Sequence, residues 1–170
     1  MGLFRDRARN LVDRANSVLP KFPPPFLACR GRKVVAVRHA DVASGANPPL
    51  SAVGQARANE LVHVFEGAAP TKILVSDLVR TQQTAAPLAL ATGVTPVVLA
   101  ALDIDAYVSA INALPQWATV FVVGHSNTVP LIIGKLTGLI LGDIPATEFD
   151  RLYVAVGAHH LELRYGAKSP

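Results

Sequence analysis

Four cationic side chains follow apolar, strand-like runs and are the residues of this sequence best suited to chemistry. Arg38 and His39 directly follow one such run, His125 follows a second, and Arg80 follows a third by a few positions. In an open α/β sheet, ligands bind just beyond the carboxyl ends of the strands, so these side chains would meet there. Two guanidinium groups and two imidazoles would form a cationic pocket that fits a phosphoryl group.

Histidine is a good covalent relay for such a group, because neutral imidazole can attack phosphorus in line and form a labile phosphoramidate. His39 stands at a strand end beside Arg38, and His125 stands where a helix is expected to begin, whose first N–H groups favour an anion. Taken singly, a histidine at a strand end is more often structural and a lone arginine is usually a solvated surface charge. Four such residues at three strand ends are not easily explained in that way.

The elements that would position these residues alternate between strand and helix. We expect strands at 33–39, 72–76, 96–99 and 118–124, with helices at 51–66, 78–92, 104–114 and from Ser126, as its cap, to Gly138. A closing hairpin is expected from the runs 151–156 and 159–164. The alternation predicts βαβ units with right-handed crossovers, and hence an α/β fold of three layers, αβα. Its central sheet would be mostly parallel, with a C-terminal antiparallel hairpin.

The composition fits one α/β domain. The chain has 170 residues, of which 51% are hydrophobic and 16% charged, enough for one core and too few for two ordinary domains. The single Cys29 excludes an internal disulfide and any Cys-rich metal site, and it fits a reduced compartment, so a cytoplasmic location is expected. The longest apolar run, at 129–141, falls well short of the ~20 residues that span a bilayer.

Positive charge is concentrated at the N-terminus. Residues 1–33 hold eight Lys and Arg against two Asp, which gives +6, whereas the rest of the chain carries −2. Apolar residues at helical spacing over 3–19 predict a short basic amphipathic helix, followed by a stiff proline-rich linker. We therefore expect a leader at 1–32 and a folded domain at 33–170. The leader would pack on its own domain or stay free, with a membrane surface as the alternative, and nucleic acid is not expected as a partner.

Several motifs, in order and well spaced, resemble those of the histidine phosphatase superfamily, which has the phosphoglycerate-mutase-like fold. Within it, the chain is similar to the small phosphohistidine phosphatases of the SixA type, from about Lys33 to the C-terminus. The resemblance is carried by Val37-Arg38-His39-Ala40, Pro49-Leu50-Ser51 with Gly54, Ser76-Asp77-Leu78-Val79-Arg80-Thr81 with Gln83-Thr84-Ala85, and Gly124-His125-Ser126.

This resemblance implies that His39 accepts the phosphoryl group, with Arg38, Arg80 and His125 as its partners in the phosphate pocket. It implies a metal-independent phosphatase without a cofactor, which hydrolyses a phosphomonoester or phosphohistidine through a covalent phospho-His39 intermediate. The partner would be a phosphorylated small molecule or a phosphohistidine protein. The connection after the third strand is short, so no large cap domain is expected.

The chain departs from the family pattern at the general acid. Larger relatives place a glutamate after the third strand, where this chain has Asp103 and Asp105, and Asp103 fits equally well as the N-cap of the next helix. Ser44 and Asn47 are the candidates for the remaining phosphate contacts of the family, together with Ser126. An open site without a strong acid suits a leaving group that departs easily, such as that of phosphohistidine.

Two other functions stay open at this point. The sequence around Ser126 is one residue short of the Gly-x-Ser-x-Gly nucleophile elbow, and Asp143 or Asp150 and His159 or His160 follow in the order of a serine hydrolase. The second alternative is a catalytically weak phosphoryl-group-binding protein, which keeps the cationic pocket but turns nothing over. The serine hydrolase would leave both arginines of the cationic pocket without a role.

Overall fold

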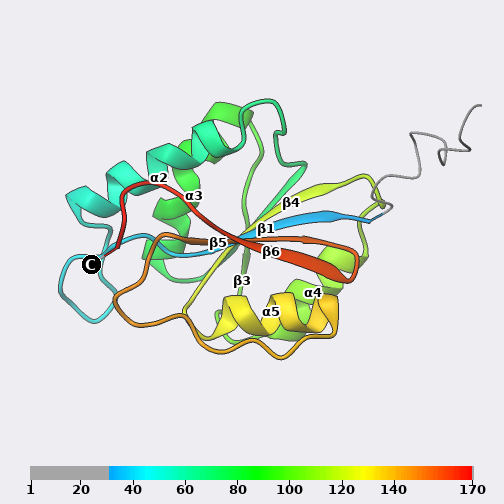
Figure 1. Ribbon diagram of the computed structural model, residues 1–170. Helices are drawn as coiled ribbons and strands as arrows, with labels where there is room; N and C mark the ends of the chain where they lie inside the picture. The colour runs from blue at the N-terminus through cyan, green and yellow to red at the C-terminus, as the bar shows by residue number, and fades with distance from the viewer. Residues whose placement is uncertain (1–30, 170) are drawn as a thin grey trace, which may run out of the picture.

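The computed structural model describes residues 31–169, which form six strands and four helices (Figure 1). The predicted leader lies outside these residues, except for Gly31 and Arg32 at its end. Every other predicted element is present, with ends that differ by at most two residues from those expected. The strands are β1 (Lys33–Arg38), β2 (Lys72–Ser76), β3 (Val97–Leu99), β4 (Thr119–Gly124), β5 (Arg151–Val156) and β6 (His159–Arg164). The helices are α2 (Ala52–Val64), α3 (Val79–Thr92), α4 (Ile104–Asn112) and α5 (Thr128–Thr137).

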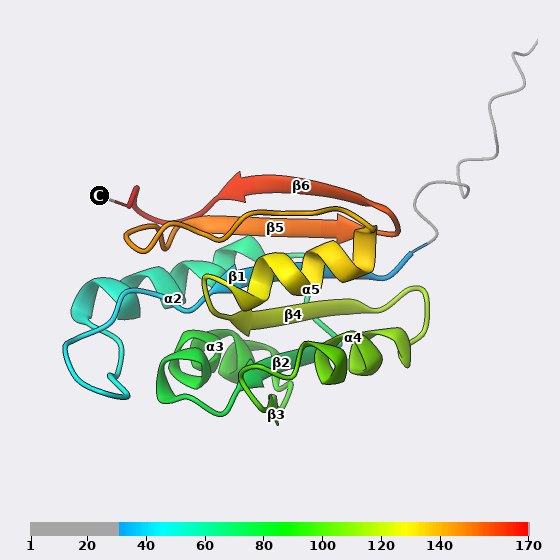
Figure 2. The ribbon, with the colours of Figure 1, turned by 90° about the horizontal axis from the view of Figure 1, so that it is seen from below.

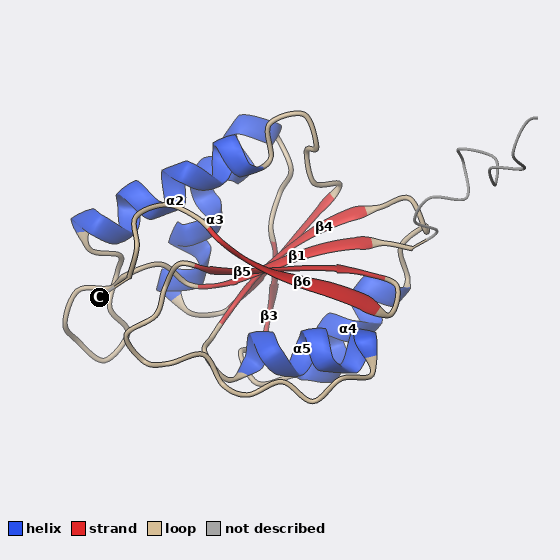
Figure 3. Cartoon of the chain, in the orientation of Figure 1, coloured by secondary structure: helices blue, strands red, loops and turns tan. Residues whose placement is uncertain are grey.

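The six strands form one sheet (Figure 3), and their order in it is β3-β2-β4-β1-β5-β6. The first four in this order run parallel, β5 is antiparallel to β1, and β6 is antiparallel to β5. The mostly parallel sheet with a C-terminal hairpin is therefore as the sequence predicts. Only residues 100–103 connect β3 to α4, which leaves no room for a large cap domain at that point.

Helices cover both faces of the sheet, α2 and α3 on one and α4 and α5 on the other (Figures 1 and 2). The strands between them are buried on both faces, and their side chains alternate between two hydrophobic clusters. Leu61 and Leu88 pack with Phe121 on the α2 and α3 face, whereas Tyr107 and Ile132 pack with strand residues on the other face. None of the helices within residues 31–169 is long and apolar enough to cross a membrane.

The sheet has a topological switch point between its neighbouring strands β1 and β4. The helix after β1 lies on one face of the sheet, and the helix after β4 lies on the opposite face (Figure 2). The two chain segments part where the strands end, and open α/β sheets bind their ligands at such a position. Arg38 pairs with Gly124 in the parallel register, so His39 and His125 follow their strands side by side at this point.

Helix α5 starts later than the sequence predicts. Ser126 was expected as its cap, but the helix begins at Thr128, with Asn127 at the N-cap position. The Thr128 hydroxyl accepts the backbone N–H of His125 at 2.9 Å, which holds residues 125–127 in a turn ahead of the helix. Ser126 therefore lies in this turn, half-buried, rather than in a capping position.

A close approach of α2 to the turn after β1 depends on Gly54. A Cβ atom built on Gly54 would lie 1.9 Å from the carbonyl oxygen of Asp41, so no larger residue fits without a shift of backbone. Ser51 caps this helix, because its hydroxyl accepts the N–H of Gly54 at 3.1 Å. The first turn of α2 is thus fixed against the residues that directly follow His39.

Candidate active site

The two histidines lie next to each other at the carboxyl ends of β1 and β4. Their ring centroids are 5.4 Å apart, with the rings edge to face. Only 5% of His39 and 8% of His125 is exposed. The backbone N–H of His39 donates to the carbonyl of Gly124 at 2.9 Å, which extends the ladder between β1 and β4 by one step beyond the strands. The sheet register, and not a flexible loop, therefore sets the distance between the imidazoles.

Within residues 31–169, hydrogen bonds engage only one of the two ring nitrogens of His39. Its Nδ1 lies 2.9 Å from the carbonyl oxygen of Ala40, and since a carbonyl only accepts, Nδ1 carries the proton and Nε2 the lone pair. Burial lowers the pKa of His39 to about 3, and the charges of Arg38, Arg80 and His125 act in the same direction. At neutral pH this side chain is therefore an uncharged imidazole with an available Nε2 lone pair, as a nucleophile requires.

His125 is held from both sides of its ring. Its Nε2 lies 3.0 Å from the hydroxyl of Ser76, and its Nδ1 lies 3.5 Å from Nη2 of Arg80. Burial lowers the pKa of His125 to about 4, helped by the charges of Arg80 and Arg38 and opposed by the carboxylate of Asp77. This histidine is also uncharged at neutral pH, and Arg80 is brought against it as the sequence suggested.

Arg38 has a structural role that the sequence did not reveal. Its Nη1 lies within hydrogen-bond distance of three backbone carbonyls, those of Pro145 at 3.0 Å, Ala146 at 2.8 Å and Glu148 at 2.9 Å. The guanidinium carbon lies 4.0 Å from the centre of the Phe149 ring. Its Nε is buried and has no hydrogen-bond partner within residues 31–169. Arg38 thus anchors the loop between α5 and β5 and keeps one buried N–H that no group of the described residues accepts.

Two interactions that sequence reasoning missed hold the turn after the first histidine. Thr84 accepts the N–H of Ala40 at 2.9 Å and donates to the carbonyl of Arg80 at 2.7 Å. The buried Arg57 donates from Nε to the Asp41 carboxylate at 2.7 Å. The motif that contains Thr84 was noted in the sequence, but nothing local in the pattern indicates which groups Thr84 and Arg57 bind.

The aspartates proposed as general acid are engaged in other interactions. Asp103 is exposed and is the N-cap of α4, where its carboxylate accepts the N–H of Ala106 at 2.9 Å. Asp105 forms an ion pair with Lys135 of α5. The helix-cap interpretation of Asp103 is therefore confirmed, while its role as an acid stays a prediction.

The remaining candidates for phosphate contacts lie at the rim or outside the cluster. Ser44 and Asn47 are exposed in a loop that is closed by a hydrogen bond from the N–H of Ala43 to the carbonyl of Pro49. No hydrogen bond within the described part of the chain joins either side chain to the histidines. Ser126 is half-buried and follows His125 directly, so it is the candidate that stays closest to the cluster.

The register of the sheet contradicts a serine hydrolase that uses Ser126. His159 pairs with Val156 of β5, which in turn pairs with Lys33 at the start of β1, and His160 is one step further along β6. Ser126 lies two positions after Gly124, which pairs with Arg38 at the other end of β1. Five residue steps of a strand separate these ends, about 17 Å. Neither histidine can therefore activate the Ser126 hydroxyl.

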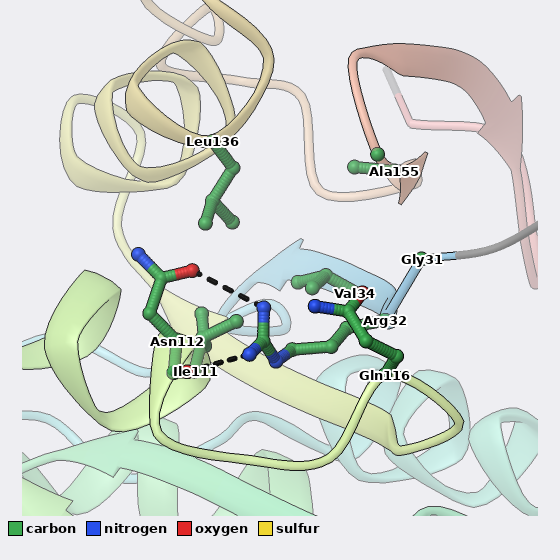
Figure 4. A pocket seen from close by; sticks show the side chains of 9 residues that line it. Gly31, Arg32, Val34, Ile111, Asn112, Gln116, Leu136 and Ala155 are labelled. Atoms are coloured by element: carbon green, nitrogen blue, oxygen red, sulfur yellow. Dashed lines mark hydrogen bonds between the residues drawn. The ribbon is translucent and has the colours of Figure 1, made fainter.

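A small cavity of about 130 Å³ (Figure 4) lies beside the start of β1, at the opposite end of this strand from His39. The guanidinium of Arg32 reaches into its wall and donates to the backbone carbonyls of Asn112 and Leu114, each at 2.6 Å, at the C-terminal end of α4. The charged group of this cavity is thus used to cap a helix. No group of three or more His, Cys, Asp or Glu side chains within residues 31–169 could hold a metal ion.

Residues 31–103 match the family model of the histidine phosphatase superfamily (branch 1), so the resemblance seen in the motifs is confirmed for this part of the chain. No curated protein sequence matches the chain. The matched segment includes Arg38, His39 and Arg80, together with helices α2 and α3.

Several solved structures that match this fold are named as phosphatases. The protein histidine phosphatase SixA complexed with tungstate superposes with a TM-score of 0.64 at 19% identity, over 79% of this chain and 96% of that one. A mycobacterial glucosyl-3-phosphoglycerate phosphatase gives 0.60 at 16% identity, over 72% and 89% of the two chains. Its complex with inorganic phosphate gives 0.58 at 17% identity, over 81% and 98%. The phosphoglycerate-mutase-like fold expected from the sequence is confirmed.

Proposed function

We propose that this chain, whose residues 31–103 match the histidine phosphatase superfamily, is a metal-independent phosphatase that works through a phospho-His39 intermediate. The phosphatases of the same fold support the broader assignment to phosphatase chemistry. The observation that carries the covalent mechanism is the free Nε2 lone pair of His39, on an uncharged ring surrounded by Arg38, Arg80 and His125.

In the first step, the phosphoryl group of the substrate binds among the cationic side chains. The buried Nε–H of Arg38 and the guanidinium of Arg80 are the donors for its oxygens, and such charge-assisted hydrogen bonds are the strong ones. The Nε2 lone pair of His39 then forms a bond to phosphorus while the bond from phosphorus to the leaving atom breaks. The negative charge that leaves with this atom is neutralised by a proton from an acid or from water.

In the second step, water attacks phosphorus and the bond between phosphorus and Nε2 breaks. The products are inorganic phosphate and His39 in its original neutral form. The carbonyl of Ala40 keeps the Nδ1 proton in place throughout, so the same ring nitrogen is available for the next cycle. The fixed positive charges stabilise the equatorial oxygens in both transition states without moving.

We infer that the substrate has a good leaving group, which makes phosphohistidine the best candidate, ahead of a phosphomonoester of an alcohol. The carboxylate expected as acid, Asp103, is exposed and used as a helix cap. When the second ring nitrogen of phosphohistidine is protonated, imidazole leaves as a neutral group, and it then depends less on an acid than an alkoxide does. The partner would then be a phosphohistidine protein or an activated phosphorylated small molecule.

Trapping the intermediate tests this proposal. The full chain is incubated with a labelled phosphate donor, quenched and mapped for an acid-labile, base-stable adduct, which we expect on His39. His39→Asn, whose amide can still bind the carbonyl of Ala40, should abolish both the adduct and turnover. His63→Asn is the matched control, because His63 is exposed on α2. Turnover that persists in His39→Asn would exclude the covalent mechanism.

A phosphoryl-binding protein without turnover is the second candidate, favoured by the missing acid at Asp103. It predicts that vanadate or phosphate binds in the micromolar to millimolar range while an activated aryl phosphate is not hydrolysed. Measuring both on the same preparation separates the two candidates. A cytoplasmic location and a leader that is not needed for the chemistry stay predictions.

A further inference from the structure

Two buried hydroxyl groups lie behind His125, on the side of its ring away from Arg80. Ser76 ends β2 and Thr81 lies in the first turn of α3, and neither has any exposed surface. The Ser76 hydroxyl lies 3.0 Å from Nε2 of His125 and 2.8 Å from the Thr81 hydroxyl. It also accepts the N–H of Leu78 at 3.3 Å. The phosphate pocket described above does not include either hydroxyl.

The positions of the protons in this series of hydrogen bonds follow from the groups that can only accept. The Thr81 hydroxyl lies 2.8 Å from the carbonyl of Leu78 and 3.0 Å from that of Ser76, so its single proton is donated to a carbonyl. Thr81 is then an acceptor toward the Ser76 hydroxyl, whose own proton points to Thr81. With its proton used there, Ser76 can only accept from His125, and Nε2 must be the ring nitrogen that carries hydrogen.

The opposite side of the ring gives the same assignment independently. A guanidinium only donates, so Nη2 of Arg80, 3.5 Å from Nδ1 of His125, favours a lone pair on Nδ1. With Nε2–H donated to Ser76, each donor has an acceptor in the series of hydrogen bonds that runs from Arg80 through His125, Ser76 and Thr81 to the carbonyl of Leu78. The reverse tautomer would place Nδ1–H against the Arg80 guanidinium. Nε2 and the Ser76 oxygen would then both be acceptors, with no hydrogen between them.

We propose that Ser76, supported by Thr81, is a positioning residue that holds neutral His125 as the Nε2–H tautomer, with Nδ1 as a hydrogen-bond acceptor on the phosphoryl side. This inference rests on the proposed function for its catalytic meaning only. An acceptor at this place can bind the protonated oxygen of a phosphoryl monoanion, beside donors from Arg80 and Arg38 for the unprotonated oxygens. Groups behind a catalytic side chain commonly fix its tautomer and orientation in this way.

The tautomer is measured directly by ¹⁵N chemical shifts of the His125 ring in the full chain at neutral pH, without any substrate. We expect a protonated Nε2 and an unprotonated Nδ1. In Ser76→Ala, both shifts should move toward the average of the two tautomers, because the buried Nε2–H has lost its acceptor. Thr81→Val should act in the same direction by another route, since it frees the Ser76 proton to be donated to Nε2. Thr92→Val is the matched control, because Thr92 donates to a carbonyl at the far end of α3.

Kinetics on an activated aryl phosphate then test the catalytic meaning. Ser76→Ala should lower kcat/KM by about 10- to 100-fold. Ser76→Thr, which keeps a hydroxyl, should retain most of the wild-type kcat/KM, and Thr92→Val should leave kcat/KM unchanged. A wild-type His125 that carries its proton on Nδ1, or unchanged ring shifts in both Ser76→Ala and Thr81→Val, would overturn the inference. A wild-type chain that binds phosphate but hydrolyses nothing would instead refute the proposed function, because the ring shifts are read without turnover.

Discussion

Acidification between pH 6 and pH 5 should destabilise this protein through its two buried histidines. The pKa of His39 is lowered to about 3 and that of His125 to about 4, chiefly by burial, from an ordinary value near 6.5. Between these values, both rings bind protons in the unfolded chain but stay neutral in the fold. The unfolded state then holds more protons, so the free energy of unfolding rises with pH and is lost as pH falls from about 6.5.

The size of the effect follows from the same values. A histidine that is protonated only in the unfolded state changes the free energy of unfolding by about 1.4 kcal/mol per pH unit. An unfolded histidine is on average about nine-tenths protonated between pH 5 and pH 6, so the two rings together contribute about 2 kcal/mol over this unit. The carboxylates of Glu148 and Asp150, whose pKa values are lowered, lose their contribution only at lower pH.

Urea denaturation of the full chain at pH 5, 5.5, 6 and 7 measures this loss. His39→Asn should reduce the difference between pH 6 and pH 5 to about 1 kcal/mol, because one of the two titrating rings is gone. Replacing the exposed His63 by Asn should leave the difference in unfolding free energy between pH 6 and pH 5 as it is in the wild type. A free energy of unfolding that is flat over this range, or a full loss that remains in His39→Asn, would refute the assignment of two neutral buried imidazoles.

Three further outcomes are expected. Arg38→Lys should lower kcat/KM at least about 10-fold, since an ammonium cannot both hold three carbonyls and present a planar fork to phosphate; equal rates would contradict this. Gly54→Ala should destabilise by about 1–3 kcal/mol in urea denaturation, because its Cβ meets the carbonyl of Asp41, and an unchanged midpoint would argue against that contact. A chain that begins at Arg32 should keep the full kcat/KM of the whole chain, and a loss would show that residues 1–31 help to build the site.

The sequence by itself determined the elements and the identity of the cationic cluster. Apolar runs of strand length, helical spacing and turn residues such as Gly93 and Gly138 are local signals, and the observed elements follow them closely. The rule that ligands bind at the carboxyl ends of strands then singles out His39 and His125 without any coordinates. The predicted N-cap at Ser126 was wrong, because residues 125–127 form a turn, with a hydrogen bond from the N–H of His125 to the Thr128 hydroxyl, and the helix begins at Thr128.

Only the tertiary structure decided how those side chains are used. Arg38 binds carbonyls more than 100 positions away, and Ser76 meets His125 across 49 positions, contacts that no local pattern contains. The sheet register separates Ser126 from His159 and His160, and so removes a hydrolase that the residue order alone allowed. The physical reason is that hydrogen bonds and burial depend on which strands are neighbours, and that is a property of the whole sheet rather than of any one segment.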